Sequence, residues 1–186
     1  DGGDANGANG AGGGTGTWDT NATANWYPGS GTTDVPWTTP GPNDAVFGGT
    51  GGIVTIAGPG ATARWVTFDA PGYTIQGSPL ALVGGGVVAN QDATISAPIS
   101  GFSSLNKSGT GTLTLSGANT FTGGLAIDDG EVRLGNAAAL YAPTPNLVVF
   151  GSNANTKTLT LNGFNATVGG LSTGATVGTS TVQNAS

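Results

Sequence analysis

The sequence predicts an all-β protein, a parallel β-helix (β-solenoid) whose coils each take about 20 residues. Three observations lead to this fold class. A Thr-plus-aliphatic pair recurs at a nearly constant step, a longer segment repeats at a fixed offset of two coils, and apolar residues alternate with polar ones in short runs. Such runs are typical of strands, and no stretch shows the 3.6-residue periodicity of an amphipathic helix.

The recurring pair predicts a stacked core. Successive pairs begin 19, 20, 20, 19, 27 and 21 residues apart, starting at Thr55, with Arg133 in place of Thr in one pair. If each step is one coil, the aliphatic members lie one above another at about 4.8 Å, the spacing of paired strands. The predicted column consists of Ile56, Ile75, Ile95, Leu115, Leu134, Leu161 and Val182.

A second column and a longer repeat support the same coil. Another apolar residue follows each member of the first column by roughly 10 to 16 residues. The segment 112–119 returns as 158–165, and 123–125 returns as 169–171, both at an offset of 46 residues. We therefore expect a unit of two coils, the second of which carries a loop through 137–145. The second column consists of Phe68, Val88, Leu105, Ile127, Val148 or Phe150, and Leu171.

The expected strands are rich in β-branched and aromatic residues and end at Gly, Asn or Ser. The chain contains 36 Gly and 10 Pro, a proportion at which disorder becomes an alternative. The alternation of apolar and polar positions argues against disorder for residues 45–185. The clearest strands are 53–56, 65–68, 112–115 and 147–150.

The chain divides into three regions. Residues 1–17 are predicted to form a Gly-rich N-terminal arm, because they contain no core-forming side chain. Residues 18–47 are predicted to form a Trp-rich cap or an irregular first coil, since several Pro residues forbid long strands there. Residues 48–186 are predicted to form the β-helix body. The aromatic residues of the cap either cover the open end of the core or offer a platform on which glycan rings stack; they are Trp18, Trp26, Tyr27 and Trp37.

The composition argues against an enzyme. The chain has no His and no Cys, which excludes nucleophile–His and thiol catalysis and leaves only carboxylate ligands for zinc. The formal net charge of −6, with only four Lys and Arg residues, disfavours nucleic acid and anionic membranes as partners. No apolar run approaches the length of a membrane span. We therefore predict no catalytic residue, no cofactor, no nucleic-acid partner and no membrane insertion.

One acidic segment, Asp128-Asp129-Gly130-Glu131, is dense enough to consider as a site. Adjacent residues of a strand point to opposite faces, so its carboxylates do not converge as a catalytic pair requires. We interpret the segment as a solvated turn, with a weak surface calcium site as the alternative. Asp1 and Asp4 could also contact a cation. Asn119 and Asn165, which occupy the same position of the 46-residue repeat, are expected to hydrogen-bond turn backbone rather than a ligand.

The segment from Leu105 to Gly124 resembles a known family. It reads L-N-K-S-G-T-G-T-L-T-L-S-G-A-N-T-F-T-G-G and is followed by a short strand, a turn at Gly130 and a further strand. This pattern closely resembles the autotransporter-associated β-strand repeat, and a degenerate copy covers residues 157–171. The resemblance implies a right-handed parallel β-helix in the passenger region of a bacterial surface protein, displayed outside the cell. The chain begins with Asp1 and lacks the translocator barrel of a classical autotransporter, so we expect a fragment or a processed, self-contained secreted subunit.

Three functions follow, in decreasing order of support. The first is an extracellular structural subunit that associates with itself head to tail, through the open ends of the solenoid and the N-terminal arm, into a surface fibre or layer. The second is an adhesin or glycan-binding passenger module that uses the aromatic residues of the cap. The third is a polysaccharide-degrading enzyme, which the lack of His and of a carboxylate pair makes the least supported.

Overall fold

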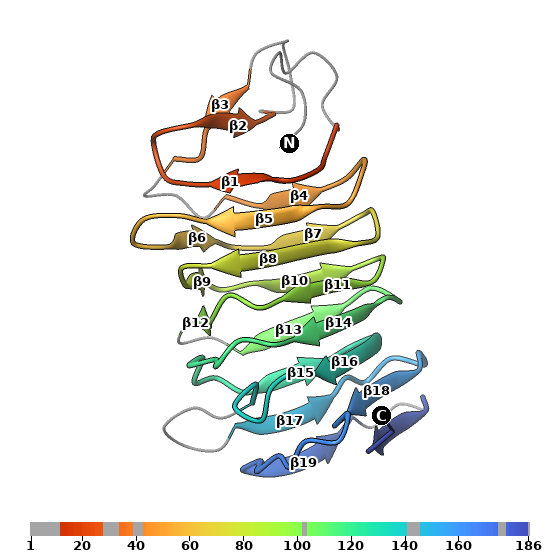
Figure 1. Ribbon diagram of the computed structural model, residues 1–186. Helices are drawn as coiled ribbons and strands as arrows, with labels where there is room; N and C mark the ends of the chain where they lie inside the picture. The colour runs from red at the N-terminus through yellow and green to blue at the C-terminus, as the bar shows by residue number, and fades with distance from the viewer. Residues whose placement is uncertain are drawn as a thin grey trace.

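The protein is an all-β solenoid. The computed structural model describes residues 12–27, 34–38, 43–101, 104–140, 146–174 and 178–185, which form twenty β-strands and no helix. The strands stack with about 21 residues per turn, and the chain proceeds from one end of the stack to the other (Figure 1). The predicted fold class is confirmed.

Two long sheets form the main walls, and all of their strand pairs are parallel, because neighbouring strands belong to successive coils. The first sheet comprises, in spatial order, β1 (Gly16–Trp18), β5 (Ile53–Ile56), β8 (Tyr73–Gly77), β11 (Ala93–Ile95), β14 (Thr112–Leu115), β16 (Gly130–Leu134), β18 (Lys157–Thr160) and β20 (Ser180–Gln183). The second comprises β4 (Ala45–Phe47), β7 (Val66–Phe68), β10 (Gly86–Ala89), β13 (Leu105–Ser108), β15 (Leu125–Ile127), β17 (Leu147–Phe150) and β19 (Gly170–Thr173).

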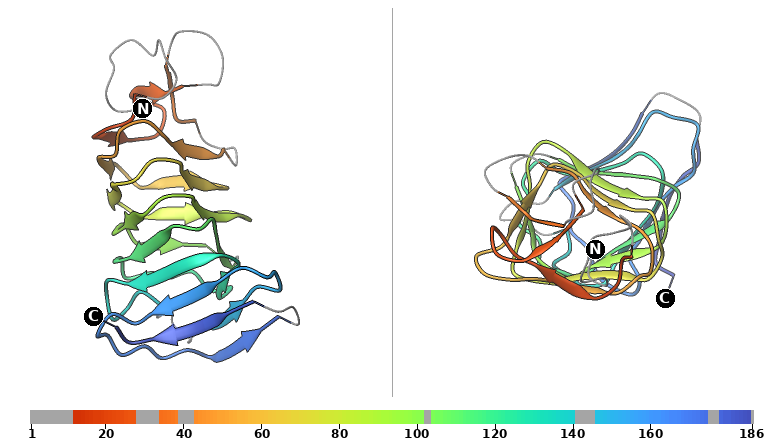
Figure 2. Two further views of the ribbon diagram at one scale, coloured as in Figure 1. Left: turned by 90° about the vertical axis from the view of Figure 1, so that its right-hand side faces the viewer. Right: turned by 90° about the horizontal axis from the view of Figure 1, so that it is seen from above.

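A short third sheet closes the cross-section of three coils. It consists of β6 (Ala61–Ala63), β9 (Leu80–Leu82) and β12 (Ile99–Ser100). Seen along the axis, successive coils trace similar outlines around a common centre (Figure 2). At the N-terminal end, β2 (Ala24–Trp26) and β3 (Val35–Pro36) form a separate antiparallel pair.

Inward-facing residues of the first sheet form a continuous apolar stack. Ile75, Ile95 and Leu115 lie opposite one another on β8, β11 and β14, and Leu134 of β16 lies opposite Leu115. All four are buried. Full burial of one such side chain contributes about 1.5–3 kcal/mol, so this stack strongly stabilises the middle coils.

The N-terminal member of the predicted column is displaced along its strand. Ile56 is buried, but it lies opposite Gly77, whereas Val54 lies opposite Ile75. A shift of two residues keeps the same side chains facing inward. The spacing in the sequence therefore identifies the inward face correctly there but not the register.

The C-terminal members also depart from the predicted column. Leu161 is only partly buried. Val182 lies opposite Leu159 rather than Leu161, and it is 44% exposed. The physical reason is that β20 is the last strand of its sheet, so no further described coil covers it.

The second column differs from the prediction at one internal position. Val88 faces outward, because the inward positions of β10 are Val87 and Ala89. An error of one residue places a side chain on the opposite face of a strand. Leu105 and Ile127 are buried as that column requires, whereas Leu171 of the terminal strand β19 is 57% exposed.

The end of the predicted N-terminal arm lies within the solenoid. Gly13 bridges to Thr50, and the hydroxyl oxygen of Thr15 accepts a hydrogen bond from the Ile53 backbone N–H at 3.1 Å. Residues 1–11, including Asp1 and Asp4, lie outside the described residues, so the arm and its cation contacts stay predictions.

A buried asparagine ties three coils together on the side of the third sheet. Asn119 is 2% exposed; its Oδ1 accepts from the Ile99 N–H at 2.8 Å, and its Nδ2 donates to the Ala139 carbonyl at 2.8 Å. The expected bonding to backbone is therefore present at Asn119. Asn165, one repeat later, is exposed in the last coil. A coil lies on each side of Asn119, which allows its amide to satisfy backbone groups in both directions.

We predict that Asn119→Ala lowers the free energy of unfolding by about 1–3 kcal/mol, because it leaves the buried Ile99 N–H without its acceptor. The matched control is Asn165→Ala, which changes an exposed residue at the same repeat position and should stay within about 0.5 kcal/mol of the parent. Urea unfolding followed by circular dichroism measures both. Equal losses in the two variants would contradict the assigned role of Asn119.

Candidate functional site

Aromatic side chains cluster at the N-terminal end of the solenoid. The Trp18 ring centroid lies 5.0 Å from that of Trp26 and 5.1 Å from that of Trp37, and Trp26 and Trp37 are 4.6 Å apart. Phe47 of the next coil lies 5.7 Å from Trp18 and 5.6 Å from Trp26. The Trp37 Nε1–H donates to the Thr62 carbonyl at 3.0 Å, which fixes the indole over the first coils. These rings cover the apolar end of the core.

This burial removes most of the predicted glycan platform. Trp18 is 0% and Trp37 is 4% exposed, and a sugar cannot stack on a ring face that other side chains already cover. The interpretation of these two residues as a stacking platform is therefore wrong. Trp26 is half-buried, and Tyr27 is 36% exposed, so these two are the remaining candidates.

The same cap obstructs the free edge of the first sheet. The Asn25 Nδ2–H donates to the Thr17 carbonyl of β1 at 2.9 Å. Asn25 belongs to β2, which pairs with β3 rather than extending the first sheet. The N-terminal edge of the solenoid is thus partly satisfied from within the chain.

The acidic segment 128–131 is engaged in local contacts. The Asp129 carboxylate accepts from the Gly130 N–H at 2.8 Å, and the Glu131 carboxylate accepts from Arg133 Nε at 3.0 Å. Among the residues that the structure describes, no three His, Cys, Asp or Glu side chains converge to hold a metal ion. Asp128 and Asp129 lie at a bend before β16, whereas Gly130 and Glu131 belong to that strand, and all four residues are half-buried. The interpretation as a solvated turn is therefore wrong for Gly130 and Glu131, and weak calcium binding stays a prediction without a formed ligand set.

Two buried lysines occupy the corner that leads from the second sheet to the first. Lys107 Nζ donates to the carbonyls of Gly109 and Asp129, at 2.7 and 2.9 Å, and so connects two successive coils. Lys157 Nζ donates to the carbonyls of Asn153 and Asn155, at 2.6 and 2.8 Å. Both side chains are almost completely buried. Charged amines therefore satisfy carbonyl groups that strand pairing leaves free at this corner.

Two glycines beside Lys107, Gly109 and Gly130, are required by the backbone conformation of this corner. Gly109 and Gly130 have φ values of +79° and +68°, a region that L residues with a Cβ rarely adopt. A Cβ on Gly130 would lie 2.6 Å from the Gly109 carbonyl oxygen. The two glycines and the lysine thus form one compact unit of the 105–134 segment.

Comparison with known proteins identifies this segment. Residues 105–134, from β13 to β16, match the family model described as the passenger-associated-transport-repeat. Over 145 residues the chain is 34% identical to the adhesin BmaC autotransporter of Brucella suis biovar 1 (strain 1330). The chain thus carries one passenger-associated-transport-repeat and is similar to an autotransporter adhesin, and in this sense it is a passenger-like repeat protein. The resemblance seen from Leu105 to Gly124 is confirmed.

The match to the Brucella adhesin covers 75% of this chain and 4% of the relative, so the chain spans a small part of the length of that protein. No solved structure is significantly similar to this chain. The described part of the passenger-like repeat protein contains no helix that could span a membrane.

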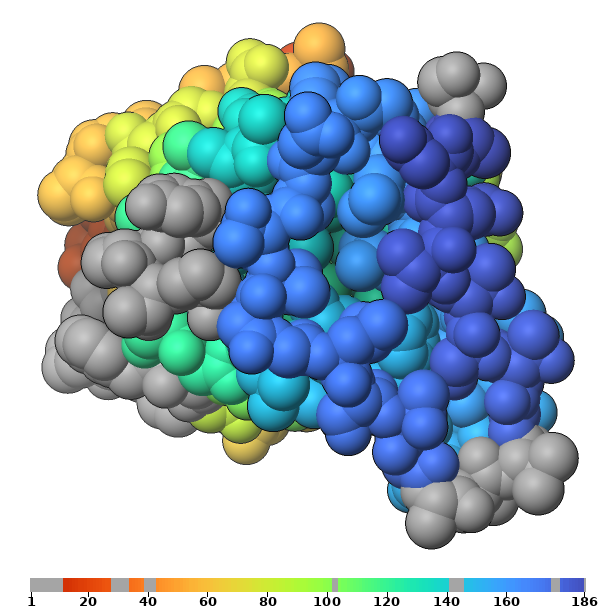
Figure 3. Space-filling model, turned by 90° about the horizontal axis from the view of Figure 1, so that it is seen from below, coloured from red at the N-terminus to blue at the C-terminus, as the bar shows by residue number. Residues whose placement is uncertain are grey.

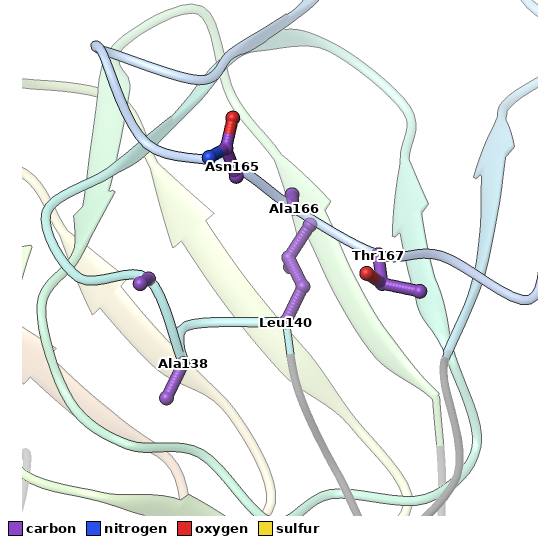
Figure 4. A pocket seen from close by; sticks show the side chains of 6 residues that line it. Ala138, Leu140, Asn165, Ala166 and Thr167 are labelled. Carbon is purple, nitrogen blue, oxygen red and sulfur yellow. The ribbon is translucent and has the colours of Figure 1, made fainter.

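A shallow pocket of about 220 Å³ lies between two of the last coils of the passenger-like repeat protein (Figure 4). Leu140 points toward Ala166, and none of the lining side chains is titratable. The pocket therefore offers no titratable group for acid–base chemistry. Its lining consists of Ala137, Ala138, Leu140, Asn165, Ala166 and Thr167.

The opposite end of the solenoid is open. Strands β19 and β20 are the last strands of the second and first sheets. Between the segments of the last coil, residues of earlier coils are visible from below (Figure 3). We call this end the C-terminal face and define it by Leu161, Phe164, Val168, Leu171 and Val182, which are exposed or only partly buried apolar residues.

Sequence reasoning missed the buried lysines. The alternation of side chains along a strand could have identified them. Lys107 is two residues from Leu105 in β13, and Lys157 is two residues from Leu159 in β18. Each lysine therefore lies on the same inward face as a buried leucine. Charged residues are rarely buried unless they are paired, which is why composition alone assigns them to the surface.

Burial lowers the pKa of Lys107 to about 8, while the carboxylates of Asp129, Asp92 and Glu131 act in the opposite direction. The unfolded chain keeps this proton up to about pH 10.5, and the folded chain releases it near pH 8. Between these values the unfolded state binds more protons, so the Lys107 contribution to the free energy of unfolding rises with pH.

We predict that the free energy of unfolding of the parent, minus that of Lys107→Met, increases from pH 8 to pH 10.5, by at most about 3 kcal/mol. Urea unfolding of both proteins at a series of pH values gives this difference. Other titrating groups are common to both proteins and cancel. A flat or falling difference would contradict a lowered pKa for Lys107.

Proposed function

We propose that this chain is an extracellular structural β-solenoid module of a bacterial surface protein. The observation that carries the proposal is the parallel ladder that runs through both long sheets and across the passenger repeat. Each coil rests on the next through backbone hydrogen bonds and apolar contacts, so the module is a stiff rod rather than a flexible linker.

A structural role also fits the chemistry of the described residues. The aromatic cluster is mostly buried, the acidic segment is locally paired, and the two buried lysines bond to backbone carbonyls. Of these hydrogen bonds, the one from Lys107 to the Asp129 carbonyl joins successive coils, and those of Glu131 and Lys157 are local. Such a rod would separate other parts of a passenger region from the cell surface.

Self-association into a fibre or layer is the finer part of this proposal. A head-to-tail fibre needs a free surface at both ends. The aromatic cap and Asn25 already occupy the N-terminal end, so a head-to-tail contact there would have to displace these side chains.

The surface location can be tested in the bacterium that encodes the chain. Antibodies raised against the folded chain should label intact cells, and external protease should remove the label. An antibody against a cytoplasmic protein serves as the control for cell integrity. Labelling only after permeabilisation would contradict the extracellular role.

Adhesion is a second candidate, favoured by the similarity to a protein named as an adhesin. The accessible aromatic residues at the cap, Trp26 and Tyr27, are the side chains that such binding would use. Trp26 is half-buried and Tyr27 is 36% exposed, which favours stacking on a single sugar rather than on an extended platform.

We predict that Tyr27→Ala weakens binding of the folded chain to any glycan or host surface that it recognises, because an exposed aromatic face is removed. Gln76→Ala, an exposed change on β8, is the control and should not alter binding. Binding is measured on a glycan array and on host cells. Unchanged binding by Tyr27→Ala would exclude this residue as the contact.

A further inference from the structure

One tryptophan lies outside the aromatic cap. Trp65 directly precedes β7, in which Val66 and Phe68 face inward, so the Trp65 side chain lies on the outer side of the second sheet. It is half-buried. Among the described residues it neither packs against the buried core nor takes part in an aromatic contact. Core packing and the covering of an end therefore do not account for this indole.

The backbone of the next coil supports the indole of Trp65. A Cβ on Gly85 would lie 2.0 Å from the Arg64 carbonyl oxygen and 3.1 Å from Trp65 Cε2, so the ring lies against this glycine. Gly85 is buried although it lies between two strands. Its neighbours Gly84 and Gly86 have no side chain that could cover the ring. One side of the indole is thus held by backbone, and the other is left on the outer surface.

An ion pair is anchored at the backbone of Trp65. Arg64 donates to both carboxylate oxygens of Asp44, from Nε at 2.9 Å and from Nη2 at 2.6 Å. The Arg64 guanidinium lowers the pKa of the Asp44 carboxyl, and a hydrogen bond from the Trp65 backbone N–H acts in the same direction. The Arg64 and Asp44 side chains are 49% and 39% exposed. The pair leaves further donors of the guanidinium and acceptor positions of the carboxylate free toward solvent.

Two exposed valines flank the same segment. Val46 is 54% exposed and lies on β4 beside Thr67, and Val83 is 45% exposed and donates its backbone N–H to the Ala63 carbonyl at 3.0 Å. A stable protein–protein interface takes about 20–30 residues on each side, so one indole and two valines favour a small ligand instead. We call this surface the Trp65 patch and define it by Asp44, Val46, Arg64, Trp65 and Val83.

A sugar ring matches both the apolar and the polar parts of the Trp65 patch. One face of a pyranose presents C–H groups, and their partial positive charge is attracted to the electron-rich face of an indole. Sugar hydroxyls both donate and accept, so two neighbouring hydroxyls can bond a carboxylate and a guanidinium together. The ion pair carries no net charge, and the formal charge of −6 on the chain disfavours an anionic ligand. A neutral sugar is therefore the ligand that fits.

We propose that the Trp65 patch binds a neutral sugar unit of a surface glycan, with the sugar ring on the indole and two adjacent hydroxyls on Asp44 and Arg64. The inference rests on the proposed adhesive role and specifies its ligand. The patch is separate from Trp26 and Tyr27 of the cap. It is formed where β4, β7 and β10 lie side by side in the second sheet, so it does not depend on either end of the solenoid.

NMR titration of the whole parent chain tests the contact directly. Through-bond assignment identifies the indole N–H signal of Trp65 among those of the four Trp residues. The probes are the methyl glycosides of glucose, galactose, mannose and N-acetylglucosamine. At least one of them should shift the Trp65 signal saturably, because the sugar ring covers the indole.

Variants on an array of neutral oligosaccharides test the roles of the side chains. Trp65→Ala and Asp44→Ala should each lower binding at least about tenfold, and Trp65→Phe should lower it less because a smaller ring remains. Leu147→Ala is the matched control, since Leu147 is 48% exposed on the outer face of the same sheet, and it should bind like the parent. The titration uses the parent protein and remains decisive if a variant fails to fold.

Three results would overturn the sugar site: no shift of the Trp65 signal with any of the four glycosides, equal array binding by Trp65→Ala and Leu147→Ala, or a shift caused by raising the protein concentration without sugar. The last result would identify a second copy of the chain as the occupant. Host-cell binding that survives in Trp65→Ala but is lost in Tyr27→Ala would also overturn the site, while leaving adhesion in place at the cap.

Discussion

The pairing of each coil with the next, in a register that keeps the same side chains facing inward, is the constraint on which the rest of the structure depends. Backbone hydrogen bonds between parallel strands determine the rise from one coil to the next, and the alternation of side chains along each strand determines which residues are buried. Ile75, Ile95 and Leu115 show the result, since each lies opposite the next and all three are buried. Shifts of two residues are tolerated, as at Ile56, whereas a shift of one would expose the column.

A stack of coils leaves backbone carbonyl groups without strand partners at its corners and apolar side chains without a covering coil at its ends. At the corners, carbonyl groups released from strand pairing are bonded by buried Lys107, Lys157 and Asn119. At the ends, apolar residues lack a covering coil. Tryptophan rings cover the N-terminal end, while Leu171 and Val182 remain exposed at the other.

Much of the fold could be predicted from the sequence, and less of the candidate sites. The step of about 20 residues, the strand composition and the motif from Leu105 onward identify a parallel solenoid and its family. The absence of His and Cys from the chain restricts the available chemistry without any structure. Trp18 was assigned to a glycan platform although it is buried, because the sequence does not distinguish an aromatic residue that covers a core from one that faces solvent. Val88 was assigned to the inward face in error, because Val87 and Val88 are both apolar and their order does not show which of the two faces the core.

The sequence by itself determined the coil length, the all-β class and the inward face of the central strands of the first sheet, because these follow from local alternation and from a repeat spacing that is visible in the chain. Only the tertiary structure decided which coil lies above which residue, that Lys107 is buried in a corner, and that Val182 is exposed at an end. Those properties depend on contacts between residues far apart in the chain. The same Thr-aliphatic pair is core where another coil covers it and surface where none does.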